Sequence, residues 1–154
     1  MILYQFKGGI ETMADLSAFA TKDKEDEGVI LPVKIDGKKI PLALKIYGSN
    51  SDVVREYETK KIRKLGFGKN GKAELSEEDI DELLEEKNEP IVIRIGGIYA
   101  YDWKKGEVVE NEPVVLFGRT LKNDKASYEY LVDKMPSLVS WIKKNSDDDS
   151  NFLG

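Results

Sequence analysis

Apolar and polar residues alternate between Val29 and Ile46, and this alternation is the clearest pattern in the chain. Asp36-Gly37 divides it into two runs, and this dipeptide favours a type I′ turn because both central residues of that turn need positive φ. The pattern therefore predicts a β-hairpin. Successive side chains of a strand point to opposite faces. The predicted faces are Leu31, Val33 and Ile35 opposite Ile30, Pro32 and Lys34 in the first strand, with Leu42, Leu44 and Ile46 together in the second.

A helix is expected directly after the hairpin. Ser49 or Ser51 would cap it, and Asp52 lies in its first turn. Basic residues fill the predicted last turn, and this order of charges complements the helix dipole. The basic residues are Lys60, Lys61, Arg63 and Lys64.

Two prolines lie within the predicted hairpin strands. Pro32 and Pro41 cannot donate a backbone hydrogen bond to a neighbouring strand, so we expect them at sheet edges or strand ends.

The stretch Pro90–Trp103 fits two patterns. Its first isoleucines alternate, which predicts a strand that would end at Gly96-Gly97. A helix also fits, because Ile91, Ile95 and Ile98 fall on one helical face. Both interpretations stay open from the sequence alone.

A spacing of three and four residues predicts that the last third of the chain is helical. Asn123 or Asp124 would cap the first helix, and Pro136 would end it and start a second. The polar run Asn145–Ser150 is expected to fray, and Phe152 after it is free to dock on the body or on a partner. The residues with this spacing are Tyr128, Leu131, Val132, Met135, Leu138, Val139 and Ile142.

These elements predict an α+β fold: an N-terminal β-hairpin followed by a helix, and a helical C-terminal third. Residues 1–12 are interpreted as a translated leader, because codons for Lys7-Gly8-Gly9 can resemble a ribosome-binding site ahead of Met13. Residues 13–27 are predicted to be a flexible N-terminal segment. Within it, Thr21–Gly28 is interpreted as a charged linker with almost nothing to bury. Residues 28–154 would form a single α+β domain.

Composition narrows the classes of function. The chain has 154 residues, of which 40% are hydrophobic and 34% charged, with a net charge of -5. This is typical of a mildly acidic domain large enough for a real core. Because it has no cysteine and no histidine, thiolate chemistry, the usual catalytic triads and histidine metal sites are excluded. No apolar run approaches the length of a membrane span. Composition leaves catalysis by carboxylates or lysines open. With no histidine, no cysteine and no catalytic motif, we expect no enzyme, no cofactor and no metal.

Three stretches that could carry chemistry are better interpreted as structure. The loop Gly66–Gly71 matches neither phosphate-binding glycine motif. Ser76–Asp79 is a capping box for an acidic helix, whose carboxylates are expected on a solvated face instead of a metal site. The basic group that begins at Arg55 and ends at Lys64 has few interleaved aromatic residues, so nucleic-acid binding is disfavoured.

The order of these pieces resembles that of a family of small proteins from tailed bacteriophages and prophages, the tail assembly chaperones encoded ahead of the tape-measure protein. The resemblance covers most of residues 13–154, and the chain departs from the family pattern at Pro90–Trp103. It brings no catalytic residues to this chain. The matching segments are the Asp15-Leu16-Ser17 opening, the charged linker, the hairpin, the helix entry Gly48–Asp52, the helical Met135–Ile142 and the terminal Asn151-Phe152-Leu153.

The resemblance implies a non-enzymatic chaperone that binds the phage tape-measure protein, or other tail proteins, in the host bacterial cytoplasm. It would keep apolar segments of its partner soluble until the tail tube polymerises around them. A structural virion component (a head–tail connector or tail accessory protein) is the alternative, and a nucleic-acid-binding phage protein is a third. Homo-oligomers stay open, and no membrane partner is expected. The candidate partner-binding residues are Tyr99, Tyr101, Trp103, Leu131, Met135, Leu138, Trp141 and Phe152.

Overall fold

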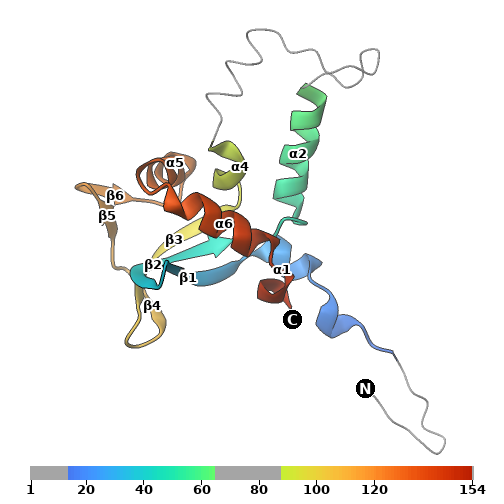
Figure 1. Ribbon diagram of the computed structural model, residues 1–154, viewed down its shortest axis with the longest axis horizontal. Helices are drawn as coiled ribbons and strands as arrows, with labels where there is room; N and C mark the ends of the chain where they lie inside the picture. Colours follow the sequence, from blue (N-terminus) through green and yellow to red (C-terminus); the bar gives the residue numbers. More distant parts are fainter. Residues whose placement is uncertain (1–13, 65–87, 154) are drawn as a thin grey trace, which may run out of the picture.

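The computed structural model describes residues 14–64 and 88–153 and shows an α+β fold (Figure 1). An antiparallel hairpin leads into a helix, and helices form the C-terminal part, as the sequence predicts. The strands are β1 (Val29–Ile35), β2 (Lys38–Ile46), β3 (Ile95–Asp102), β4 (Glu107–Val109), β5 (Val114–Leu116) and β6 (Arg119–Leu121). The helices are α1 (Lys22–Glu27), α2 (Asp52–Lys64), α4 (Glu89–Val92), α5 (Lys125–Lys134) and α6 (Ser137–Asp147), with short 3-10 helices η1 (Ser17–Phe19) and η2 (Asp149–Phe152).

Three sequence predictions concern segments outside the described residues. They are the leader over residues 1–12, the glycine loop at 66–71 and the capped acidic helix that begins at 76. The 3-10 helix η1 lies in the N-terminal segment that the sequence predicts to be flexible.

Four strands form an antiparallel sheet in the order β1-β2-β3-β4, and β5 pairs with β6 in a separate hairpin. The turn between β1 and β2 has φ of 51° at Asp36 and 78° at Gly37. Positive φ at both positions is the requirement of a type I′ turn, so the predicted hairpin turn is confirmed. Pro32 lies in the edge strand, as expected. Pro41 lies instead inside β2, a central strand, where the β1–β2 register is irregular and before the first β2–β3 pair at Leu42.

A bulge in β3 explains why Pro90–Trp103 fitted two patterns. Lys45 pairs with Gly97 but the next residue, Ile46, pairs with Ile95, so Gly96 is an extra residue in the ladder. The insertion lets both Ile95 and Ile98 face the core, a spacing that imitates one face of a helix. The strand predicted over the first isoleucines is wrong, since Ile91 lies in helix α4 and β3 begins only at Ile95. The predicted strand end at Gly96-Gly97 is also wrong, because both glycines lie within β3.

Helices α4, α5 and α6 cover one face of the sheet, and α6 crosses in front of it in Figure 1. The predicted break at Pro136 is confirmed, because α5 ends at Lys134 and α6 begins at Ser137. Asp124 caps α5, and its carboxylate accepts a 2.8 Å hydrogen bond from the N–H of Ser127. The core combines both halves of the chain: Val33, Leu42, Leu44, Ile46, Ile91, Val92, Ile95, Ile98, Leu121, Tyr128, Leu131, Val132, Leu138 and Ile142.

Two segments expected to be loose are ordered parts of the fold. The charged linker proposed at Thr21–Gly28 contains helix α1, and its Glu25 is only 1% exposed. The frayed run proposed at Asn145–Ser150 continues α6 and then forms η2. Ser146 in this run is buried and donates a 2.7 Å hydrogen bond to the carbonyl of Tyr47. These polar side chains are ordered by tertiary hydrogen bonds, which hydrophobic periodicity does not report.

Candidate protein-binding face

The second face of the four-stranded sheet is the best candidate for a functional surface. Strand alternation directs one set of side chains to the core and the other set to this face. The described helices that cover the core side chains lie on the opposite face of the sheet. On the second face, the side chain of Ile30 is 46% exposed. We call this surface the open face. It consists of Ile30, Pro32, Ala43, Lys45, Tyr99, Tyr101 and Val108.

Strand register builds an apolar row across the open face. Pro32 pairs with Ala43, which pairs in turn with Tyr99. Ala43 is fully buried between these larger neighbours, whereas Tyr99 stays half-buried. A Cβ atom at Gly97 would lie 2.6 Å from the Tyr99 hydroxyl oxygen, so the missing side chain leaves room for the ring to lie along the strand. The row therefore presents a broad aromatic surface instead of a deep cavity.

Trp103 is held in a fixed orientation at the end of this row. Its ring meets that of Tyr101 edge to face, with 5.2 Å between centroids and an interplanar angle of 78°. The indole Nε1–H donates a 2.6 Å hydrogen bond to the carbonyl of Ile40. Lys39 Nζ lies 5.6 Å from the centroid of the Trp103 ring, within cation–π range. Contacts from β2 and β3 thus preorganise both aromatic rings.

Tyr101 and Trp103 line an open groove of about 600 Å³, which we call the Tyr101–Trp103 groove. Its walls mix aromatic and aliphatic groups with charges of both signs. The carboxylate of Asp102 is engaged in the turn, where it accepts the N–H groups of Lys104 and Lys105. Such a lining suits a polypeptide with apolar and polar side chains better than a phosphate backbone. The other lining residues are Lys39, Pro41, Lys104, Lys105, Glu107, Val108, Val109, Glu110 and Glu112.

The structure separates the candidate partner-binding residues into two groups. Tyr99, Tyr101 and Trp103 are half-buried on the open face and at its groove. The remaining candidates belong to the core or its margin. Leu131 is 2% exposed and Leu138 and Phe152 are 0% exposed, while Met135 and Trp141 are partly buried against the core. Phe152 thus docks on the body of the protein, which was one of its two expected positions.

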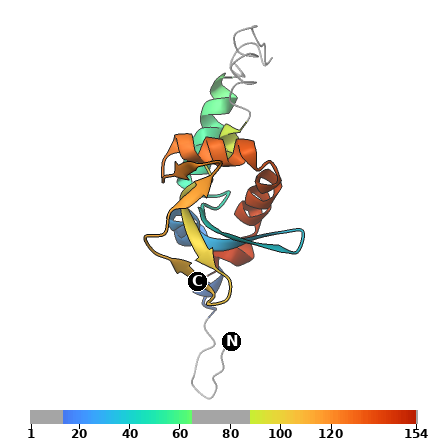
Figure 2. The ribbon, with the colours of Figure 1, turned by 90° about the vertical axis from the view of Figure 1, so that its left-hand side faces the viewer.

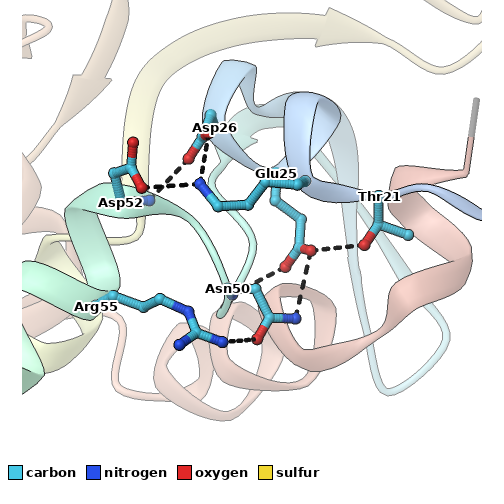
Figure 3. Close-up of polar contacts among 7 residues, drawn as sticks. Thr21, Glu25, Asp26, Asn50, Asp52 and Arg55 are labelled. Atoms are coloured by element: carbon cyan, nitrogen blue, oxygen red, sulfur yellow. Dashed lines mark hydrogen bonds and ion pairs between the residues drawn. The ribbon is translucent and has the colours of Figure 1, made fainter.

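A polar cluster that the sequence analysis missed joins α1 to the start of α2 (Figure 3). The Glu25 carboxylate accepts hydrogen bonds from Thr21 Oγ1 at 2.8 Å and from Asn50 N–H at 2.9 Å. Asn50 Nδ2 donates a further bond to it at 3.3 Å. Gly48 makes this approach possible, since a Cβ there would lie 2.2 Å from Glu25 Cγ. The buried charge is therefore satisfied by polar partners from two distant segments.

Asp26, beside Glu25, supplies the N-terminal cap that Ser49 or Ser51 was expected to provide. Its carboxylate accepts the N–H of Asp52 at 2.7 Å, while the Ser51 hydroxyl is buried without a hydrogen-bond partner. Lys22 Nζ bonds both Asp26 and Asp52. The hydrogen bond from Lys22, and then that from the Asp52 N–H, lower the pKa of Asp26. A carboxylate from another element thus occupies the positive end of α2.

Arg94 is the least expected buried residue, with 3% of its surface exposed. One guanidinium nitrogen donates to the carbonyl of Pro90, whereas its Nε has no hydrogen-bond partner. Burial lowers the pKa of Arg94, and the charges of Asp147 and Glu58 oppose that shift. Arg94 thus lies just before β3 under the electrostatic influence of Glu58 on α2 and Asp147 at the end of α6, and we assign it no ligand.

The basic group on α2 is interrupted by acidic residues. Arg55, Lys60 and Arg63 line a shallow depression together with Asp52 and Glu56. Carboxylates at this position repel a phosphate backbone, so the surface does not favour nucleic-acid binding.

Within residues 14–64 and 88–153, no group of three or more acidic side chains is placed to hold a metal ion. None of the helices in these ranges is long and apolar enough to cross a bilayer. Comparison with protein-family models, curated proteins and solved structures found no match.

Proposed function

We propose that this protein is a non-enzymatic tail assembly chaperone that binds apolar segments of a phage tape-measure protein in the host bacterial cytoplasm. The observation that carries the proposal is the open face, with its row of half-buried aromatic rings ending in the Tyr101–Trp103 groove. The tape-measure protein as partner follows from the resemblance in sequence order. The open face supports the more general part, binding of a polypeptide.

Aromatic side chains suit this role for a physical reason. Tyrosine and tryptophan bury a large area while ordering few torsions, and they are enriched at protein interfaces. Tyr99 and Tyr101 are already ordered by the sheet, and Trp103 is ordered by its hydrogen bond to Ile40. These side chains would therefore lose little further conformational entropy when a partner binds. The open face thus offers a preorganised apolar surface that would shield an apolar segment of the partner from water.

Lysines on the open side of β1 and β2 add selectivity to this apolar surface. Lys34 and Lys39 occupy opposite positions in the β1–β2 ladder, and Lys45 pairs with Gly97 beside Tyr99. A bound segment with acidic residues between its apolar ones would be favoured over a basic one. Burial of apolar area would still supply most of the affinity, so binding should resist moderate salt.

The proposal is tested by co-expression with the tape-measure protein of the same phage. The expected result is that the tape-measure protein stays soluble with the wild-type chain and aggregates without it. Tyr101→Lys, which places a charge in the groove, should lose this effect, whereas Leu153→Lys, at a residue 46% exposed elsewhere, should keep it. Insoluble tape-measure protein in every case would reject the proposal.

Mass spectrometry of purified virions separates the chaperone from a structural component. A chaperone leaves after assembly, so virions should lack this chain. Its presence at a fixed copy number per particle would favour a head–tail connector or tail accessory protein instead.

A further inference from the structure

Two hairpin turns of this protein have nearly the same pair of positive φ angles but different residues at the first position. Asp36 and Gly37 in the β1–β2 turn have φ of 51° and 78°, and Phe117 and Gly118 in the β5–β6 turn have φ of 50° and 75°. Asp, Asn or Gly usually occupies the first of these positions, because a bulky side chain at positive φ is strained. Phe117 therefore occupies a position for which the fold alone would favour a smaller residue.

Burial within the chain does not offset this strain. Phe117 is 78% exposed, and Val115 two residues earlier is 55% exposed. The base of the hairpin is nevertheless held firmly. Leu121 is 7% exposed in the core, and the Arg119 guanidinium lies 4.4 Å from the centroid of the Tyr130 ring. The hairpin thus presents an apolar ring at the tip of a fixed projection, which is seen at the left edge of Figure 1. Strain retained at an exposed aromatic residue indicates a binding role.

The Tyr101–Trp103 groove lies on the same side of the molecule as this tip. Figure 2 turns that side toward the viewer, with β4 and its turn below the β5–β6 hairpin. Glu110 and Glu112 on the groove are exposed, and neither forms an ion pair within the described part of the chain. Arg119 beside the tip carries the opposite charge. The groove lining also includes Lys39, Lys104 and Lys105, so the complementarity to Arg119 is confined to acidic residues such as Glu110 and Glu112. One chain therefore carries both a projecting apolar knob with a basic residue beside it and an aromatic groove that includes acidic partners for that residue.

We infer that two copies of the chain associate about a two-fold axis, with Phe117 of each copy inserted into the Tyr101–Trp103 groove of the other. Arg119 of each copy then faces Glu110 and Glu112 of its neighbour. A two-fold axis satisfies both contacts at once, because every chain supplies one knob and one groove. Each contact is small, so the dimer is weak and depends on concentration. This inference goes beyond the proposed function: Phe117 of a second copy would occupy the groove that a tape-measure segment would use, so the two would compete for it. The dimer can be tested without a tape-measure protein.

Sedimentation equilibrium of the full chain over about a hundredfold range of concentration measures this association. The wild-type protein should shift from monomer toward dimer as its concentration rises. Phe117→Asn removes the knob and suits positive φ, so it should weaken dimerisation about tenfold or more while remaining folded. Phe19→Asn removes a ring that is 71% exposed elsewhere and should leave the dimer unchanged. Glu112→Lys should also weaken the dimer.

Photo-crosslinking locates the contact directly. A benzoylphenylalanine at position 117 keeps the aromatic knob, and mixing isotopically heavy and light chains identifies crosslinks between copies. The expected crosslinks join position 117 to residues 101–112 of a second chain. A monomer at every concentration, equal dimerisation by wild type and Phe117→Asn, or intermolecular crosslinks confined to other surfaces would each overturn the inference.

Discussion

The Glu25 carboxylate accepts a 2.9 Å hydrogen bond from the backbone N–H of Asn50, although the two residues belong to different elements of the fold. This bond fastens α1 to the turn that begins α2. Glu25 is 1% exposed, so water does not replace its partners. The contact makes a segment composed almost entirely of charged residues part of the folded body.

Glu25→Ala should lower the free energy of unfolding by about 2 kcal/mol, because it removes the carboxylate that accepts hydrogen bonds from the Thr21 hydroxyl and the Asn50 N–H. Glu27→Ala is the matched control, since Glu27 lies in the same helix but is exposed. Its effect should stay within about 0.5 kcal/mol. Urea unfolding followed by circular dichroism measures both changes. Equal effects of the two substitutions would show that Glu25 does not hold α1 in place.

The cap that Asp26 provides should make stability depend on pH. The hydrogen bond from Lys22 lowers the pKa of Asp26 in the folded protein, and the bond from the Asp52 N–H lowers it further. A carboxyl group with a depressed folded-state pKa stabilises the fold above its unfolded pKa, about 3.9, and loses that contribution as pH falls through the folded pKa.

Asp26→Asn should therefore be less stable than wild type at about pH 7, and the difference should shrink toward about pH 3. Chemical unfolding at several pH values measures the gap between the two proteins. A gap that is constant with pH would show that the charge of Asp26 does not contribute.

The apolar stripe of the C-terminal helices should behave as core. Leu131 is 2% exposed, and Leu131→Ala should cost about 2–5 kcal/mol through lost burial and the cavity it leaves. Leu153→Ala, at a residue 46% exposed, should cost much less. Thermal and urea melts compare the two. A change near zero for Leu131 would mean that the stripe is free for a partner after all.

The strain at the β5–β6 turn should be visible in the stability of the monomer. Phe117→Asn should raise the free energy of unfolding by about 1 kcal/mol, because asparagine tolerates the φ of 50° that phenylalanine adopts there. Melts at low protein concentration isolate this effect from association. A loss of stability would show that the exposed ring makes contacts the fold needs.

The sequence predicted those parts of the fold that depend on local patterns. Alternation around Asp36-Gly37 predicted the hairpin, and the spacing around Pro136 predicted two helices that meet there. The attachment of α1 to the start of α2 could not be predicted in this way, because Glu25 is hydrogen-bonded to Asn50, twenty-five residues away. Nor could the course of β3 be decided, since the extra Gly96 shifts the register and disguises the strand periodicity.

The candidate site was predicted only in part, for a related reason. Periodicity identified the apolar side of each element without showing which sides cover one another. Leu131 and Tyr99 therefore appeared as equal candidates, although packing buries the first and leaves the second half-exposed on the open face. The strain at Phe117 was missed because a Phe-Gly dipeptide carries no established turn signal.

The claim that the open face binds apolar polypeptide can be checked by the fluorescence of Trp103. The chain has 2 tryptophans, so a Trp141→Phe variant leaves Trp103 as the single reporter in the groove. Titration with peptides that cover the tape-measure protein should move its emission to shorter wavelength, with a midpoint that resists moderate salt. A Trp103 emission wavelength that does not change with any of the peptides would contradict the claim.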